Sequence, residues 1–169
     1  MHVARMARSF GMHVRVYDIN QDNFLAEIIN FKYVTLEELL KVSDIISLHV
    51  PYNKYTHHII NKQALDSMKK GAILINTARG GLVDTPALIE ALKQGTLYGA
   101  GLDVLEGEEY MNEESISDMP AAIAAKAIEQ NTELTKLPNV IITPHNAFNS
   151  IEAVERIVLK TVENIAEVK

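Results

Sequence analysis

The 169-residue sequence contains no cysteine, and this absence excludes disulfide bonds, thiolate metal ligands and a cysteine nucleophile. It agrees with a reducing compartment, so we expect a cytoplasmic protein. Glycine and proline are also scarce, with 8 and 5 residues, and no low-complexity linker interrupts the chain. The composition, 47% hydrophobic and 22% charged, is typical of a chain that forms a packed core.

The sequence also lacks a long apolar run and a block of basic charge. No apolar stretch approaches the length of a membrane span, and the N-terminus lacks the layout of a signal peptide. The formal net charge is −6, with basic residues interleaved among acids, which disfavours a nucleic-acid surface. We therefore predict neither a membrane nor a nucleic-acid partner. The length of the chain suits one domain, or one domain with an appendage.

What the sequence does contain is an alternation of short apolar runs with helical segments. This pattern is typical of an α/β protein with a parallel sheet. Helix signals include Thr35 with Glu38, Asn61, Thr85 followed by Pro86, and Asn149 with Glu152. The predicted strands span 13–18, 44–51, 72–77, 97–105 and 139–145, and the predicted helices span 2–10, 35–42, 62–69, 86–94 and 150–169. Between 106 and 138 the pattern weakens to an acidic loop and an alanine-rich segment that favours a helix.

The ends of the predicted strands carry most of the informative polar residues. In open α/β sheets, ligands bind at the carboxyl ends of the strands. The residues at these ends are Asp18, Pro51, Thr77 to Arg79, Asp103 to Glu108, and His145.

Asp18 ends a strand at the place where an acid accepts hydrogen bonds from an adenosine ribose and disfavours a 2′-phosphate. An exposed turn residue is an equally good interpretation of the spacing alone. The glycine-rich turn that should precede such an acid is not in the sequence. We therefore expect a Rossmann-type doubly wound parallel sheet that lacks its first strand and its glycine-rich turn, which would lie upstream of residue 1.

Three further residues are candidates for chemistry. Arg79 precedes two glycines at a strand end, where a guanidinium can grip a carboxylate, although a structural arginine paired with a local acid has the same pattern. His145 follows Pro144 at a strand end and could shuttle a proton, or could be structural. Glu108 could orient that imidazole, but five acids crowd its loop and spacing does not choose among them. For His57 and His58 we predict an ordinary solvated loop.

Three segments together resemble one known family. "LINTARGGLVDTPALIEALKQGTLYGAGLDVLEGEE", "SLHVP" and "NVIITPHNAF" are similar to the nucleotide-binding domain of the D-2-hydroxyacid dehydrogenases. The wording "DVLEGEE" resembles the D-lactate dehydrogenase branch, which includes the dehydrogenases of vancomycin resistance. The likeness covers nearly the whole chain.

The resemblance implies a role for each candidate residue. Arg79 would bind the substrate carboxylate and polarise the keto group, Glu108 would partner the catalytic histidine, and His145 would be the acid/base. The cofactor would be NAD and no metal would be required. The implied cofactor-binding residues are Asp18 at the ribose, Val50 and Pro51 at the adenine, and Thr56, Thr77, Ala78, Arg79 and Asp103 along the nicotinamide half.

The same resemblance implies the reaction and the domain plan. We expect reduction of a 2-oxo acid, pyruvate above all, to the D-2-hydroxy acid, in a homodimer. Residues 1–148 would form an N-terminally incomplete NAD-binding domain, and 149–169 a helix leading toward a substrate domain. Family members are about twice this length, so we expect a partial chain whose turnover alone is doubtful. The alternatives are an NAD(H)-sensing corepressor-type protein and a dehydrogenase for a bulkier substrate.

Overall fold

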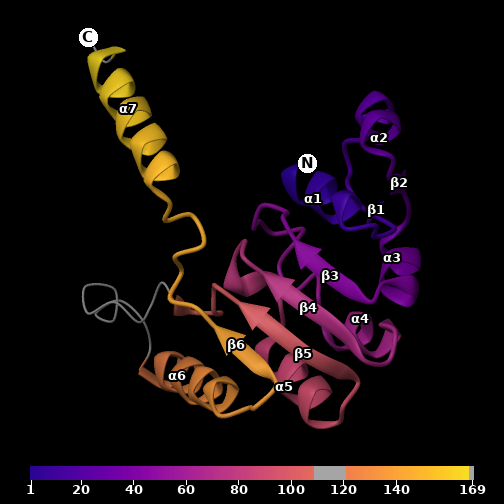
Figure 1. The fold of residues 1–169 in the computed structure, drawn as a ribbon. Coiled ribbons are helices and arrows are strands. Elements are labelled where there is room, and N and C mark those ends of the chain that lie inside the picture. Colours follow the sequence, from indigo (N-terminus) through magenta and orange to yellow (C-terminus); the bar gives the residue numbers. More distant parts are fainter. Residues whose placement is uncertain (109–120, 168–169) are drawn as a thin grey trace.

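The computed structural model describes residues 1–108 and 121–167 of the chain. Helices and strands alternate along it, which confirms the predicted α/β class (Figure 1). The helices are α1 (His2–Ser9), α2 (Asn23–Ile29), α3 (Leu36–Val42), α4 (Lys62–Ser67), the 3₁₀ turn η1 (Gly80–Leu82), α5 (Thr85–Lys93), α6 (Ala121–Thr135) and α7 (Ile151–Glu167). The strands are β1 (Arg15–Val16), β2 (Lys32–Tyr33), β3 (Ile45–Leu48), β4 (Ala72–Asn76), β5 (Leu97–Leu102) and β6 (Val140–Ile142).

All strand pairs of the described residues are parallel, but they form two sheets rather than one. The larger sheet has the order β3-β4-β5-β6, and the smaller one contains only β1 and β2. Strands β1 and β3 are not paired with each other, so the order is interrupted between them. This interruption agrees with the prediction of a Rossmann-type sheet from which one strand is missing.

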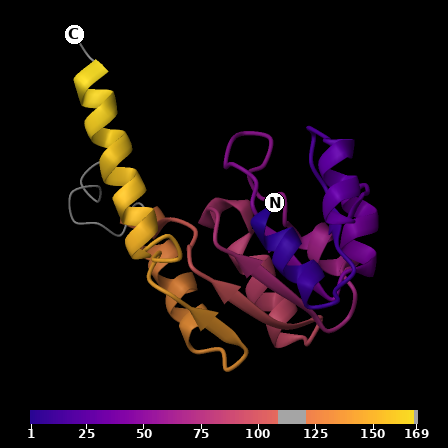
Figure 2. The same cartoon turned by 45° about the horizontal axis from the view of Figure 1, so that its top comes forward.

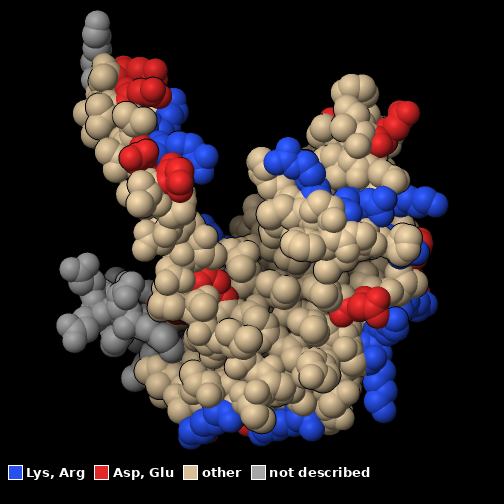
Figure 3. Space-filling view, viewed as in Figure 1, with Lys and Arg blue, Asp and Glu red and all other residues tan. Residues whose placement is uncertain are grey.

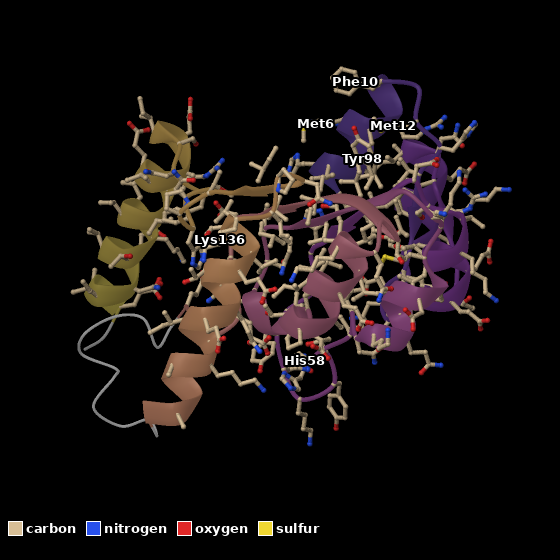
Figure 4. The ribbon with its side chains drawn as sticks, turned by 90° about the horizontal axis from the view of Figure 1, so that it is seen from below. Met6, Phe10, Met12, His58, Tyr98 and Lys136 are labelled. Carbon is tan, nitrogen blue, oxygen red and sulfur yellow. The ribbon has the colours of Figure 1, made fainter. Side chains whose placement is uncertain are left out.

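The two faces of the four-stranded sheet are covered differently. Helices α4, α5 and α6 lie on one face, and α1 lies over part of the other (Figures 1 and 4). On the α1 side, Ile45, Tyr98 and Ile141 remain exposed. The space-filling view of this face shows few charges at its centre and basic side chains along its lower edge, near the amino ends of the strands (Figure 3).

The core lies between the four-stranded sheet and its covering helices. Leu74 of the central strand β4 is 0% exposed and pairs in register with Ile46 of β3 and Ala100 of β5. Helix α5 buries six of its residues against this layer. The apolar run of β4 is that of a strand in the middle of a parallel sheet, and burial alternates along it because one face packs against the helices.

Most predicted elements are present, with differences at their ends. Strand 97–105 stops at Leu102, so Asp103 to Glu108 form a loop, and the predicted strand 13–18 is only two residues long. The alanine-rich segment forms α6, as its composition indicates. Helix α2 and strand β2 are not among the predicted elements.

Two predicted helix caps are wrong by one residue. Asp84, rather than Thr85, caps α5, because its carboxylate accepts from the amide of Ala87 at 3.2 Å, three residues on. Thr85 is instead the buried first residue of the helix. At α7 the side chain that accepts from the first turn is the hydroxyl of Ser150, which receives the amide of Ala153 at 3.2 Å, and not that of Asn149.

Helix α7 extends away from the sheet in both ribbon views (Figures 1 and 2). It has no buried residue, and its apolar side chains are exposed: Ile151, Val154, Ile157, Val158, Leu159, Val162 and Ile165. The division of the chain after residue 148 stays a prediction. None of the described helices is long and apolar enough to cross a membrane.

Candidate active site

The loops that carry the three candidate catalytic residues emerge at the same edge of the larger sheet. Arg79 follows β4, Glu108 lies in the loop after β5, and His145 follows β6. Because these strands are parallel neighbours, their carboxyl ends meet at one edge. The fold thus gathers residues that lie up to 66 positions apart in the sequence, from Arg79 to His145.

The turn that bears Arg79 is fixed by hydrogen bonds with the side chain of Asn76, the last residue of β4. The buried Asn76 amide donates to the carbonyl of Arg79 at 2.8 Å, and its oxygen accepts from the amide of Ala78 at 3.0 Å. Gly80 then passes so close to the next loop that a Cβ atom would lie 2.0 Å from the carbonyl oxygen of Leu105. The glycine is therefore required for direct contact between the arginine turn and the loop that leads to Glu108.

The guanidinium of Arg79 is exposed and donates to the carbonyl of Ala78 at 2.6 Å. It makes no ion pair with any acid among the described residues. The interpretation of Arg79 as a structural arginine paired with a local acid therefore finds no support in the described part of the chain. A planar cation exposed at this edge can accept an anionic ligand.

Glu108 and His145 form an ion pair of 2.9 Å between Oε1 and Nδ1. The second carboxylate oxygen of Glu108 accepts from the amide of Leu105 at 3.0 Å, which fixes the side chain within its own loop. Since a carboxylate only accepts, the imidazole must carry its proton on Nδ1, and Nε2 is the nitrogen left for exchange with a ligand. Both side chains keep partial exposure, 24% for Glu108 and 45% for His145.

Asp103 is a buried carboxylate that holds the loop around His145. One oxygen accepts from the hydroxyl of Thr143 and from the amide of Asn146 at 3.0 Å, and the other from the amide of Ala147 at 2.9 Å. Burial opposes ionisation of Asp103, but these hydrogen bonds and the nearby imidazole outweigh it and hold its pKa below the ordinary value. The loop they fix includes His145 in a left-handed conformation, with φ of 49°.

The predicted cofactor residues lie on four segments. Val50, Pro51 and Thr56 share one loop, which the Thr56 hydroxyl closes by donating to the carbonyl of Pro51 at 2.7 Å. Thr77 and Ala78 belong to the Arg79 turn, and Asp103 directly follows β5. Asp18 is exposed at the end of β1, in the smaller sheet, and accepts from the amide of Asn20 at 2.8 Å. Among the described residues, no hydrogen bond or ion pair joins Asp18 to the other predicted residues.

One pair at this edge is not expected from the sequence. The Nε2 atom of His58 lies 2.5 Å from Oε1 of Glu106, with both side chains about 70% buried. The prediction of an ordinary solvated loop is therefore wrong for His58, although His57 is exposed. The two partners are 48 residues apart, and no local pattern could have joined them.

The described residues contain no group of three or more His, Asp or Glu side chains placed to hold a metal ion. What the site does present is a cation, an imidazole supported by a carboxylate, and open loops at the carboxyl edge of a Rossmann-type sheet. An exposed guanidinium can bind an anion, and a carboxylate-supported imidazole can exchange a proton with it.

Comparison with known proteins specifies the family. The family described as "D-isomer specific 2-hydroxyacid dehydrogenase, NAD binding domain" matches residues 1–147. A D-specific alpha-keto acid dehydrogenase of Enterococcus faecium is 44% identical over 164 residues, 96% of this chain and 47% of that protein. A glyoxylate reductase of Thermococcus litoralis is 45% identical over 153 residues, 90% of this chain and 40% of that protein.

The solved structures agree. A D-lactate dehydrogenase of Aquifex aeolicus, whose structure was determined with NAD and lactic acid, has a TM-score of 0.85 at 44% identity. The match covers 97% of this chain and 48% of the Aquifex aeolicus chain. The chain belongs to the D-isomer specific 2-hydroxyacid dehydrogenases as their NAD-binding domain. It spans about half the length of the relatives it matches. The predicted family and the predicted NAD cofactor are confirmed.

Proposed function

We propose that this chain supplies the cofactor-binding and acid/base part of an enzyme that reduces a small 2-oxo acid, pyruvate above all, to the D-2-hydroxy acid. The observation that carries the proposal is the Glu108–His145 pair at the same edge as the exposed guanidinium of Arg79. Relatives named for D-lactate, D-specific alpha-keto acids and glyoxylate support the substrate class.

Each of the three residues has a distinct role. Bound NADH supplies the hydride that reaches the keto carbon. Arg79 holds the substrate carboxylate and stabilises the negative charge that develops on the keto oxygen. His145, protonated on both nitrogens, donates the Nε2 proton to that oxygen, while Glu108 keeps Nδ1 protonated and the ring oriented.

The cofactor would lie along the carboxyl edge of the sheet. Asp18 would accept from the adenosine ribose, Val50 and Pro51 would contact the adenine, and Thr56, Thr77, Ala78, Arg79 and Asp103 would line the nicotinamide half. Both carboxylate oxygens of Asp103 are already occupied by the 143–147 segment. We therefore propose that Asp103 contributes to the nicotinamide half of the site indirectly, by fixing the 143–147 loop with its hydrogen bonds.

The test is keto-acid-dependent oxidation of NADH by the intact full-length protein, as wild type and as His145→Asn. Asparagine tolerates the left-handed backbone found at residue 145 but does not shuttle protons. We expect kcat to fall about 10²–10⁴-fold, the usual contribution of a positioned acid/base. The control His13→Asn changes an exposed histidine away from the site and should keep wild-type rates.

Two outcomes would contradict the proposal. Equal rates for wild type and His145→Asn would remove His145 from the chemistry. Tight NADH binding without turnover of pyruvate, glyoxylate or a branched 2-oxo acid would favour the NAD(H)-sensing alternative. The branched acid belongs in the series because a D-2-hydroxyisocaproate dehydrogenase is 35% identical and has a TM-score of 0.82. A homodimer and a cytoplasmic location stay predictions.

A further inference from the structure

The His58–Glu106 pair joins segments that are far apart in the sequence and that flank the catalytic residues. A carboxylate only accepts hydrogen bonds, so the imidazole donates through Nε2 to Oε1 of Glu106 at 2.5 Å. Glu106 lies two residues before Glu108, and His58 lies two residues after Thr56. The pair therefore ties the loop with the predicted cofactor contacts to the loop that carries the partner of His145.

Glu106 has further partners that fix its position. Its second carboxylate oxygen accepts from the amide of Thr85 at 3.2 Å, at the N-terminus of α5, where a negative charge is favourable. Its backbone carbonyl accepts from the buried amide of Asn131 of α6 at 3.2 Å. Glu106 thus connects the catalytic loop to two helices of the packed layer.

His58 is fixed on its other side to the turn that follows Arg79. Its backbone amide donates to the carbonyl of Gly81 at 2.9 Å, and Ile60 donates to the carbonyl of Leu82 at 3.0 Å. His58 adopts a left-handed conformation, with φ of 49°, which is unusual for a residue other than glycine. Its imidazole stacks on that of His57 at 3.8 Å between ring centroids. Figure 4 shows the side chain on the same side of the sheet as α5.

We propose that His58 and Glu106 are positioning residues of the dehydrogenase site. Together they hold three segments against one another: 51–58, 79–82 and 103–108. Release of the pair would loosen the Glu108 loop. The described direct contact between this loop and the Arg79 turn would then be the one between Gly80 and Leu105. This proposal rests on the proposed function for its effect on catalysis, but its structural part does not.

The structural part is tested on the full chain by hydrogen exchange of the Leu105 amide. This amide donates to Glu108 Oε2, so its protection reports whether the catalytic carboxylate is in place. In His58→Ala we expect exchange at Leu105 to accelerate at least about tenfold, since local opening determines protection. His58→Gln retains a donor for Glu106 and should recover most of the protection.

A matched control is Lys93→Ala. Lys93 of α5 pairs with Glu133 of α6, which lies 40 residues away, and so forms another ion pair between distant segments, but on the surface away from the site. Lys93→Ala should leave exchange at Leu105 unchanged. If His58→Ala does not fold, Glu106→Gln serves instead, because it removes the charge and one of the two acceptor oxygens while keeping the size of the side chain. Unchanged protection of Leu105 in the folded variant would overturn the proposal.

The catalytic part is tested by steady-state kinetics of the same variants. Misplacement by about 1 Å can cost about 10²-fold in rate, so we expect kcat of His58→Ala to fall about 10–100-fold, with recovery in His58→Gln. The double variant His58→Ala/Glu106→Ala should be no slower than the slower single variant, because both changes release the same pair. If the substitutions acted only by lowering stability, the fraction of folded enzyme would fall, but the losses of the two single variants would add and His58→Gln would not restore kcat. Additive losses, or no rescue, would overturn the positioning role.

The two proposals fail in distinguishable ways. If the intact full-length wild-type protein oxidises no NADH with any 2-oxo acid, the proposed function fails, whereas the exchange of Leu105 still decides whether the pair holds the Glu108 loop. If the wild type turns over and His58→Ala has both wild-type kcat and wild-type protection, only the positioning proposal fails.

Discussion

Residues 1–34 and residues 35–142 show the same alternation of helix and strand, but only the second region has a packed core. Of the buried hydrophobic residues, Phe31 alone comes from the first region, and the others lie from Leu40 to Leu134. Helices α1 and α2 bury no residue, whereas α5 buries six. The apolar pattern of a segment can thus define its place in the topology, while its stability requires a second layer against which its apolar face packs.

The candidate site residues are distributed over both regions. Arg79, Glu108 and His145 all follow strands of the four-stranded sheet, whereas Asp18 follows a strand of the two-stranded one. The geometry of the Glu108–His145 pair therefore depends on the packed region, and the proposed ribose contact depends on the region with little core. The following substitutions test this division, from the largest expected effect to the smallest.

Leu74→Ala should destabilise the protein most. Leu74 is fully buried in the central strand, and such truncations cost about 2–5 kcal/mol through lost burial and an unfilled cavity. Ile28→Ala on the exposed side of α2 should cost less than about 0.5 kcal/mol, as is usual at a surface. Urea unfolding of both variants measures the contrast. Equal losses would show that the two regions unfold as one equally packed unit.

Gly80→Ala should have an intermediate effect on stability and a larger effect on activity. An added Cβ would lie 2.0 Å from the Leu105 carbonyl oxygen, so the arginine turn and the Glu108 loop must separate. Overpacking of this kind costs about 1–3 kcal/mol. Thermal unfolding and the NADH oxidation rate measure the two effects. A variant with wild-type stability and rate would show that the two loops separate without consequence.

Asp103→Asn should change how stability depends on pH. The pKa of Asp103 is lowered on folding, so its contribution is fully present above the ordinary value of 3.8 and is lost as pH falls through the lower folded pKa. The wild type should therefore lose part of its stability below about pH 4, and Asp103→Asn should lack that part of the loss. Denaturant unfolding between pH 3 and pH 7 is the measurement. Parallel pH profiles for the two proteins would contradict the role assigned to the ionised Asp103 carboxylate.

Asp18→Ala should have the smallest effect on stability, because Asp18 is exposed and bonds only a neighbouring turn amide in the described structure. Its effect should instead appear in cofactor choice. Loss of the carboxylate removes the repulsion of a 2′-phosphate, so the preference for NADH over NADPH should narrow. Fluorescence titration with the two cofactors measures it, and an unchanged ratio of dissociation constants would remove Asp18 from the ribose site.

The sequence predicts the sheet and its helices well where the apolar pattern is strong. The strands around Leu74 and the helix after Asp84 follow from burial and capping signals, with errors of one residue because neighbouring Asp, Thr and Ser side chains can all cap. Helix α2 and strand β2 are missed because they are short and hardly buried, so packing gives them little pattern.

Side-chain pairing is what the sequence could not supply. Glu108 is one of five acids in its loop region, and only the family resemblance singles it out before the 2.9 Å contact with His145 is known. The His58–Glu106 pair and the hydrogen bond from Thr143 to Asp103 both join residues at least 40 positions apart. Such contacts arise only when parallel strands bring their carboxyl ends together, and residue spacing along the chain does not encode them.

The interruption between β1 and β3 has a consequence for the edge of the larger sheet. Within the described residues β3 pairs on one side only, with β4, so its other side presents backbone groups that can add a further strand. Its sequence, Ile45 to Leu48, contains no charged residue, whereas β1 and β2 carry Arg15 and Lys32. A parallel strand that paired with both β1 and β3 would therefore join the two sheets into one, and it would do so beside the apolar β3.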